Sequence, residues 1–395
     1  MDLSLIFVII ILGGWFFSKL FLKLKLPSIV GMLFCGLLIS YFLKNYLSQT
    51  LWEISPLIKS TALIVILLRA GLGLNKKLLK KTGKIAVLMS IIPCLLEGIS
   101  LTILIHLILG YEIFNAALPA FMIAAVSPAV IIPSMLDLKE KGYGQSKEVP
   151  TIVLAASSID DVFAITIFGI FLNISMTSNF TFSKLHIFKE LLSIPYSIIS
   201  GVIIGYLTGL FLVYVFKNLK IRATEKTILL ITISTLIVYI GNQIQSATLL
   251  GAMTISYVLF EKSNTFAKEI SNKLAKIWIP AEIFLFVLVG SSVDINIIAK
   301  IGFKRLLILI IGLIFRSLGV LLATKSSQLN YKERLFCVIS FIPKATVQAA
   351  LGMIPLQLGI IHGEEILAFA VIAILFTAPL GLILMNTLSK KLLNN

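Results

Sequence analysis

The sequence is poor in charged residues, which make up only 13% of its 395 residues. Chains that fold in water carry about 25% charged residues, since most of their surface faces the solvent. Apolar residues account for 58% of this chain, which is more than a water-facing surface can accommodate. The deficit excludes a soluble protein of two or three domains and makes lipid the expected solvent.

Acidic residues are scarcer than basic ones: 18 Asp and Glu stand against 34 Lys and Arg, a formal net charge of +16. In a soluble protein such an excess could indicate nucleic-acid binding. Here the basic residues lie in short gaps between apolar runs, the distribution typical of cytoplasmic loops in membrane proteins. We therefore expect membrane lipid, and no nucleic acid, as a partner.

Cysteine and histidine are also rare, with three of each. All three cysteines lie inside apolar runs, so no disulfide framework or redox site is expected. The sequence contains no phosphate-binding loop, no cluster of metal ligands and no nucleophile triad. These absences predict a protein that is not an enzyme and needs no cofactor.

Thirteen apolar runs are candidate membrane helices, for which about 20 apolar residues each are needed. They cover residues 3–18, 28–43, 57–75, 85–109, 114–136, 149–173, 190–216, 227–241, 246–260, 277–293, 302–324, 335–357 and 366–388. The first run is interpreted as a span rather than a cleaved signal peptide, since no basic segment precedes it. The eighth and ninth runs are short, and twelve spans result if they form one re-entrant hairpin.

The distribution of basic residues predicts the orientation. With the N-terminus outside and the C-terminus in the cytoplasm, the inside loops hold 24 basic residues and the outside loops hold 7. Cytoplasmic loops carry such an excess, so we expect a multi-pass protein of the cell (inner) membrane. Arg69, Arg316 and Lys344 are the basic residues that this arrangement cannot place in a loop.

A single offset of 219 residues links unusual residues of the two halves. The matching pairs are Gly71 and Gly290, Asn75 and Asp294, Glu97 and Arg316, and Ser127 and Thr346. The offset maps the third to fifth spans onto the tenth to twelfth, an odd shift that inverts the second half in the membrane. Chance similarity between apolar segments is the alternative, but the independent span count gives the same parity and favours an inverted repeat.

Charged residues inside spans are the first candidates for function, because each costs at least about 2.5–3.5 kcal/mol when unpaired at mid-membrane. They are Glu97, Asp160, Asp161, Glu282, Arg316 and Lys344. An interfacial position is equally compatible with Glu282. Arg69 and Asp294 lie nearer span ends, where their side chains can reach the interface.

The doublet Asp160-Asp161 is the most informative of these, since it lies half-way through the sixth span. Neighbouring residues on a helix point about 100° apart, so the two carboxylates are expected to have different roles. Two close anions in a dry setting also raise each other's affinity for a proton. At least one of them is therefore expected to exchange protons for cations.

Two spans contain residues that interrupt a helix. Pro128 and Pro133 fall in the fifth span and Pro343 in the twelfth, at matching places in the two halves. Proline lacks an N–H and disfavours a helical residue before it. Interrupted helices at membrane depth persist only where the freed backbone groups line a cavity or bind something, which indicates an ion site near the midplane.

A small hard cation prefers oxygen ligands. Asp161, the hydroxyls of Ser127 and Thr346, and unwound backbone carbonyls can supply them, so Asp161 is the expected Na⁺ or Li⁺ ligand. Lys344 supplies a counter-charge, which we expect to pair with Asp160. Glu97 and Arg316 are expected to form a second buried pair, in preference to separate contacts with backbone or water.

At these residues the sequence resembles the monovalent cation/proton antiporters, and most closely the NHA-type sodium/proton exchangers. The matching stretches are Leu68–Leu74, Ala125–Val130, Ser157–Asp161 and Ile342–Ala350. The resemblance implies an all-helical fold with crossed discontinuous helices, and places the family's ion-carrying aspartate at Asp161. It also implies that Asp160 pairs with Lys344, and Glu97 with Arg316.

The resemblance further implies an elevator-type exchanger, usually a homodimer. Within a single transmembrane unit of residues 1–395, residues 85–173 and 302–388 would form the moving core. Residues 1–75 and 227–293 would form the dimerisation scaffold, and 190–216 the linker helix. The small-residue stripe Gly201, Gly205 and Gly209 on the seventh span fits either a dimer contact or packing inside one subunit.

The predicted function is exchange of Na⁺ or Li⁺ for H⁺ by alternating access. A K⁺/H⁺ exchanger of the same fold is the main alternative, since selectivity between these cations is beyond the sequence. An organic-anion symporter is disfavoured by the aspartate doublet. An ion channel is disfavoured by the internal inverted repeat, and a membrane sensor by buried carboxylates beside two interrupted helices.

Overall fold

The computed structural model describes residues 2–43, 46–73, 76–176, 184–219, 221–243 and 248–393. These residues form sixteen α-helices and no strand, which confirms the predicted all-helical architecture. The helices are α1 (Leu3–Lys23), α2 (Ser28–Leu43), α3 (Gln49–Gly73), α4 (Lys76–Leu109), α5 (Ile113–Ala124), α6 (Pro128–Glu140), α7 (Val149–Met176), α8 (Lys184–Asn218), α9 (Ala223–Gln243), α10 (Thr248–Lys262), α11 (Asn264–Ser291), α12 (Ile295–Ala323), α13 (Tyr331–Ser340), α14 (Thr346–Leu351), α15 (Ile354–Gln357) and α16 (Gly363–Leu393).

Nine helices in the described part of the chain are long and apolar enough to cross a membrane: α1, α3, α4, α7, α8, α9, α11, α12 and α16. Helices α2 and α5 are apolar but shorter. Each of the thirteen predicted runs coincides with one helix or with helices separated by a break. The protein is therefore a multi-pass membrane protein, while thirteen crossings, and whether 227–241 and 246–260 both cross, stay predictions.

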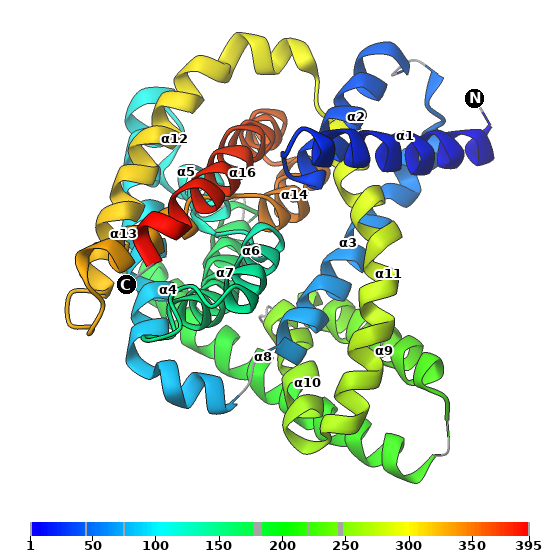
Figure 1. The fold of residues 1–395 in the computed structure, drawn as a ribbon. Helices are drawn as coiled ribbons and strands as arrows, with labels where there is room; N and C mark the ends of the chain where they lie inside the picture. The colour runs from blue at the N-terminus through cyan, green and yellow to red at the C-terminus, as the bar shows by residue number, and fades with distance from the viewer. Residues whose placement is uncertain are drawn as a thin grey trace. The chain divides into compact units, whose positions relative to one another are not determined.

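The chain divides into two compact units. The first comprises Met1–Ser55, Lys80–Phe171 and Ile283–Asn395, and the second Pro56–Leu79 and Leu172–Glu282. In the first unit α16, which is red in Figure 1, is the central helix and packs against α2, α5, α6, α12, α13, α14 and α15. The predicted core, scaffold and linker are defined by how the protein would move and not by compactness, so their boundaries stay a prediction.

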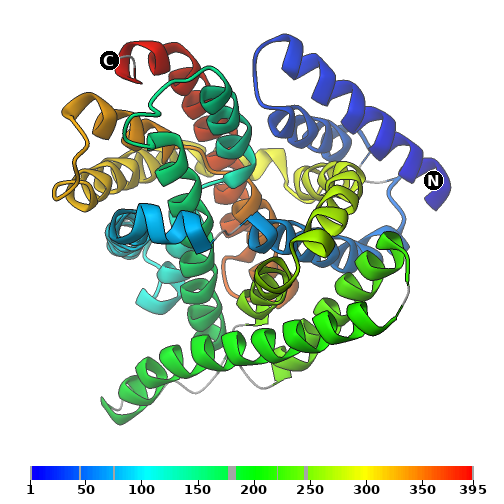
Figure 2. The same cartoon turned by 60° about the horizontal axis from the view of Figure 1, so that its bottom comes forward.

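In the second unit the glycine stripe of α8 packs against α10, and the two helices run side by side (Figure 2). A Cβ atom added to Gly205 would meet the backbone of Gly251, and one added to Gly209 would lie 2.7 Å from Val258 Cβ. A Cβ on Gly251 would lie 3.0 Å from the Gly201 carbonyl oxygen. The stripe therefore packs closely inside one subunit, which is one of the two interpretations that the sequence allowed, while a dimer contact stays a prediction.

The two halves of the chain repeat the same series of helices. Helices α4 and α12 begin at Lys76 and Ile295, which are 219 residues apart, and the break between α5 and α6 matches the break between α13 and α14. Two pairs of equivalent residues touch: Arg316 contacts Glu97, and Ser127 contacts Thr346. Only residues near a two-fold axis can contact their own equivalents, so these pairs locate the axis of the inverted repeat.

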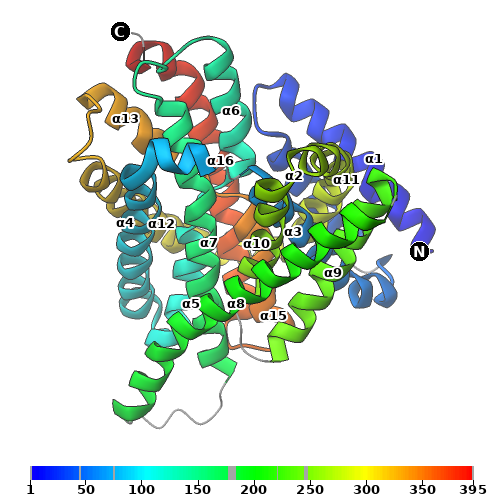
Figure 3. The same cartoon turned by 90° about the horizontal axis from the view of Figure 1, so that it is seen from below.

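Small residues let α4 and α12, which are labelled in Figure 3, approach closely along this axis. A Cβ on Gly319 would lie 2.5 Å from the Pro93 Cα atom, and one on Gly312 would lie 2.6 Å from Leu101 Cδ2. Close backbone approach is how membrane helices gain packing contacts without a hydrophobic driving force. It brings Glu97 on α4 opposite Arg316 on α12.

Gly319→Ala is expected to destabilise the protein, because the added methyl group meets backbone atoms of Pro93 that cannot rotate away. Overpacking of this kind costs about 1–3 kcal/mol. The measurement is the melting temperature of purified protein in detergent. Gly169→Ala on α7 is the matched control, since a Cβ there would meet no heavy atom within 4 Å. Equal melting temperatures for the two variants would contradict the close approach.

Candidate functional site

Two interrupted helices meet in the first unit. Helix α5 ends at Ala124 and α6 begins at Pro128, while α13 ends at Ser340 and α14 begins at Thr346. The two unwound segments are hydrogen-bonded to each other, since the Ser127 amide donates to the Pro343 carbonyl oxygen at 2.8 Å. Proline is well placed as the first residue of α6, because a helix leaves its first N–H groups without partners.

Pro133 does not break the helix that contains it. Helix α6 runs without interruption from Pro128 to Glu140, so the predicted break at Pro133 is wrong as a position of unwinding. Near the start of a membrane helix a proline removes a single backbone donor, and local adjustment tolerates this loss. The unwinding lies at Pro128 and Pro343 only, among the three predicted prolines.

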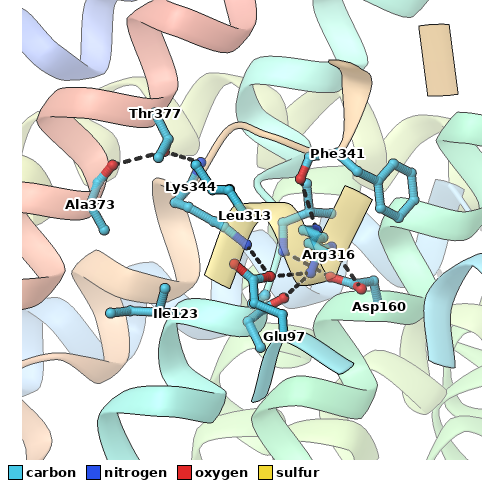
Figure 4. A network of polar contacts seen from close by, with 12 residues as sticks. Glu97, Ile123, Asp160, Leu313, Arg316, Phe341, Lys344, Ala373 and Thr377 are labelled. Atoms are coloured by element: carbon cyan, nitrogen blue, oxygen red, sulfur yellow. Dashed lines mark hydrogen bonds and ion pairs between the residues drawn. The ribbon is translucent and has the colours of Figure 1, made fainter. Parts of the chain in front are cut away.

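Arg316 is the centre of a buried network of charges (Figure 4). Its Nη1 atom donates to Glu97 Oε2 at 2.7 Å, and its Nη2 atom donates to Asp160 Oδ1 at 2.9 Å. The same guanidinium donates to the carbonyl of Ala124 and, through Nε at 2.8 Å, to that of Phe341. It therefore holds two carboxylates and satisfies a carbonyl just where each interrupted helix ends.

Lys344 pairs with Glu97, where the sequence predicted Asp160. The Lys344 ammonium donates to Glu97 Oε2 at 2.7 Å, and neither side chain is exposed. Asp160 instead forms an ion pair with the guanidinium of Arg316. The predicted contact between Glu97 and Arg316 is present, so Glu97 serves both cations while Asp160 has one.

The two adjacent aspartates have different surroundings. Asp160 is fully buried; its Oδ1 accepts from Arg316, and its Oδ2 accepts from the Val126 amide at 2.8 Å. Asp161 is also buried, but its Oδ1 atom has no hydrogen-bond partner among the residues that the structure describes. Asp160 is thus fixed to the unwound segment, and Asp161 keeps an unused acceptor in a dry setting.

The hydroxyl groups of Ser127 and Thr346 meet where the unwound segments cross. Their oxygen atoms are 3.5 Å apart, and both residues are buried. Hydroxyl, carboxylate and backbone carbonyl oxygens are the ligand types that small hard cations prefer. The structure thus brings the predicted hydroxyl ligands together; their role as ligands, like that of Asp161, stays a prediction.

Two polar residues at the site were missed by the sequence analysis. Thr377 Oγ1 accepts from the Lys344 amide at 2.8 Å and donates to the Ala373 carbonyl at 2.7 Å, which anchors the unwound segment to α16. Gln348 donates to carbonyls at the end of α5. A glutamine beside a helix break in an apolar span was a usable signal, whereas a lone threonine carries none.

The charged residues that were set aside in the sequence lie elsewhere. Arg69 stands over the ring of Trp278, 5.8 Å from its centroid, and interacts electrostatically with Glu282 within the second unit. Asp294 caps the start of α12, where its side chain accepts from the Asn296 amide at 2.9 Å. The predicted position of Asp294 near the membrane interface stays a prediction.

This combination defines a class of protein. Inverted repeats, interrupted helices that cross in the membrane and polar residues buried at the crossing are features of secondary transporters. Residues 7–390 match the family model described as sodium/hydrogen exchanger, transmembrane. The chain belongs to the sodium/hydrogen exchanger family, which confirms the predicted monovalent cation/proton antiporter family and supports cation/proton antiport as its activity.

The similar proteins are transporters. Sodium/hydrogen exchanger 9B1 of Macaca fascicularis is 31% identical over 408 residues, covering 99% of this chain and 78% of the relative. Sodium/hydrogen exchanger 9B2 of Homo sapiens is 32% identical, over 93% of this chain and 70% of its own. The solved sodium proton antiporter MjNhaP1 of Methanocaldococcus jannaschii superposes with a TM-score of 0.81 at 22% identity, covering 98% of both chains, and shares the fold.

Arg316→Lys is expected to destabilise the folded protein. A lysine keeps the charge, but its three donors radiate from one atom and cannot reach two carboxylates and two carbonyls at once. Each buried acceptor left without a donor costs about 1–3 kcal/mol. The melting temperature in detergent is the measurement, with the exposed Arg222 changed to Lys as the control. Equal stability of the two variants would contradict the central position of Arg316.

Lys344→Ala is expected to lower the melting temperature and to change the pH profile of any exchange activity, because it leaves Glu97 with less compensation. Adding Glu97→Gln should recover part of the lost stability, since the uncompensated charge is then removed. Adding Asp160→Asn instead should recover less. Greater recovery of the melting temperature with Asp160→Asn would instead support the pairing of Lys344 with Asp160 that the sequence predicted.

Proposed function

We propose that this protein exchanges Na⁺ or Li⁺ for H⁺ across the membrane by alternating access, and that the two substrates compete for Asp161. The observation that carries the proposal is the contrast between the neighbouring aspartates. Both oxygens of Asp160 accept hydrogen bonds, whereas Asp161 Oδ1 has no donor in the described part of the chain. Of the two aspartates, Asp161 is therefore the one that can take up and release a ligand without breaking the hydrogen bonds of Arg316 and Val126.

The charges of the cluster support a monovalent substrate. Glu97, Asp160 and Asp161 contribute three negative charges, and Arg316 and Lys344 contribute two positive ones. One negative charge is left, and one proton or one monovalent cation balances it. Uncompensated charge is strongly unfavourable in a lipid-enclosed core, so the site binds one or the other.

Competition gives the exchange cycle. Ionised Asp161 binds the cation together with the hydroxyls of Ser127 and Thr346 and unwound carbonyls, which replace the ion's hydration shell. Protonation of Asp161 removes the negative charge that holds the cation and releases it. Asp160 remains ionised beside Arg316 throughout, so the protein's fixed charges are the same in both loaded states.

The movement proposed for the cycle is of the elevator type. Residues 85–173 and 302–388 would move as one body against a scaffold of residues 1–75 and 227–293, with 190–216 as the linker, in a homodimer of the cell membrane with an external N-terminus. The contacts of Arg316 with Glu97, Asp160 and both interrupted helices support joint movement of the two core halves.

Asp161→Asn is expected to abolish cation-dependent proton movement while the protein stays folded. The asparagine amide carries no charge to hold a cation and does not take up and release a proton as a carboxylate does. The assay is dequenching of a pH-sensitive dye in everted vesicles or proteoliposomes, with Na⁺, Li⁺ and K⁺ added in turn. Asp137→Asn is the matched control, since Asp137 is exposed and its side chain pairs with the exposed Lys141.

Full activity of Asp161→Asn with an intact melting transition would refute the assignment of the site. Dequenching with K⁺ but not Na⁺ or Li⁺ would replace the proposed substrate by the potassium alternative. Flux that does not saturate and cannot drive the opposite ion uphill would indicate a channel.

A further inference from the structure

Gln348 joins the second interrupted helix to the end of the first. It lies in α14 and is fully buried. Its Nε2 atom is 2.9 Å from the carbonyl oxygens of Met122 and Ala125 and 3.4 Å from that of Ile123. All three acceptors are neutral backbone groups at the point where α5 gives way to the unwound segment.

These contacts supply donors to carbonyls at the end of α5. A helix leaves its last four carbonyls without intrahelical donors, and at membrane depth no bulk water replaces them. The Ala124 carbonyl accepts from Arg316, and the carbonyls of Met122 and Ala125 accept from Gln348. Two side chains from the second half of the chain therefore fix the backbone that leads to Ser127.

The amide is oriented by its donors alone. The three carbonyls require the nitrogen to face α5, and Gln348 Oε1 is buried with no partner among the described residues. An amide also supplies two N–H groups without adding charge. A cation at this position would cancel the single negative charge that the site leaves for its substrate.

The repeat gives no equivalent residue. The position 219 residues earlier is Ala129, which has no polar side chain, so one interrupted helix is held by an amide of the other and not the reverse. The glutamine is therefore a specific addition to one half of a symmetric backbone.

We propose that Gln348 is a positioning residue of the exchange site, which holds the end of α5 so that Ser127 and the unwound carbonyls stay in register with Asp161. The proposal rests on the exchange function proposed above. Gln348 acts through the backbone of α5 and requires no contact with the transported ion.

The test compares Gln348→Glu and Gln348→Met in the dequenching assay across a range of pH, alongside the melting temperature of each variant. A protonated glutamic acid has one O–H to donate to the carbonyls of α5, whereas its ionised form has none and repels them. Methionine has similar length and no donor at any pH.

Gln348→Glu is expected to keep near-normal exchange at acidic pH, where its side chain is protonated. As the pH rises, this variant should lose exchange activity at a pH where the unsubstituted protein is still active. Gln348→Met is expected to raise the KM for Na⁺ about tenfold throughout, the change in an equilibrium that a lost buried hydrogen bond produces. The control is Gln357→Glu, the same substitution at an exposed glutamine of α15, which should leave the profile unchanged.

A purely structural role predicts another pattern, in which both variants melt earlier but the folded fraction has an unchanged KM and pH profile. That result overturns the proposal, as does normal behaviour of both variants. Absence of cation-dependent proton movement in the unsubstituted protein would refute the proposed function itself, and is recognisable without any Gln348 variant.

Discussion

A guanidinium buried beside two carboxylates and two helix ends is the interaction on which the core of this protein depends. Unwound backbone is tolerated in a membrane only when its polar groups have partners, and buried charges only when they are paired. Arg316 meets both conditions together, since its donors reach Glu97, Asp160 and the carbonyls of Ala124 and Phe341. The planar fork of arginine makes this possible, and no other side chain presents five donors in fixed directions.

The same network gives the adjacent residues Asp160 and Asp161 different surroundings, although their side chains are chemically identical. Asp160 lies on the side of α7 that meets Arg316 and the Val126 amide, so both of its oxygens are occupied. Asp161 follows one residue later, about 100° around the helix, and its Oδ1 is left without a donor in the described residues. Helix geometry thus gives the two carboxylates different surroundings, and the proposed mechanism needs no other difference between them.

The sequence predicted those features that depend on local pattern. The offset of 219 residues paired Glu97 with Arg316, and proline chemistry located the breaks at Pro128 and Pro343. The partner of Lys344 could not be predicted, because a flexible lysine reaches either carboxylate and the choice follows from where the arginine fork binds. Spacing in the sequence carries no information on such competition between neighbours.

The two halves related by the inverted repeat supply opposite kinds of polar side chain to the site. The three carboxylates Glu97, Asp160 and Asp161 come from the first half, while the donors Arg316, Lys344 and Gln348 come from the second. Separating the two halves would leave the charges of Glu97, Asp160, Arg316 and Lys344 and several carbonyls without partners, a change that lipid surroundings make prohibitive. Any movement that opens the site must therefore preserve these contacts between the two halves. This constraint favours the proposed rigid movement of both halves together over rocking of one half against the other.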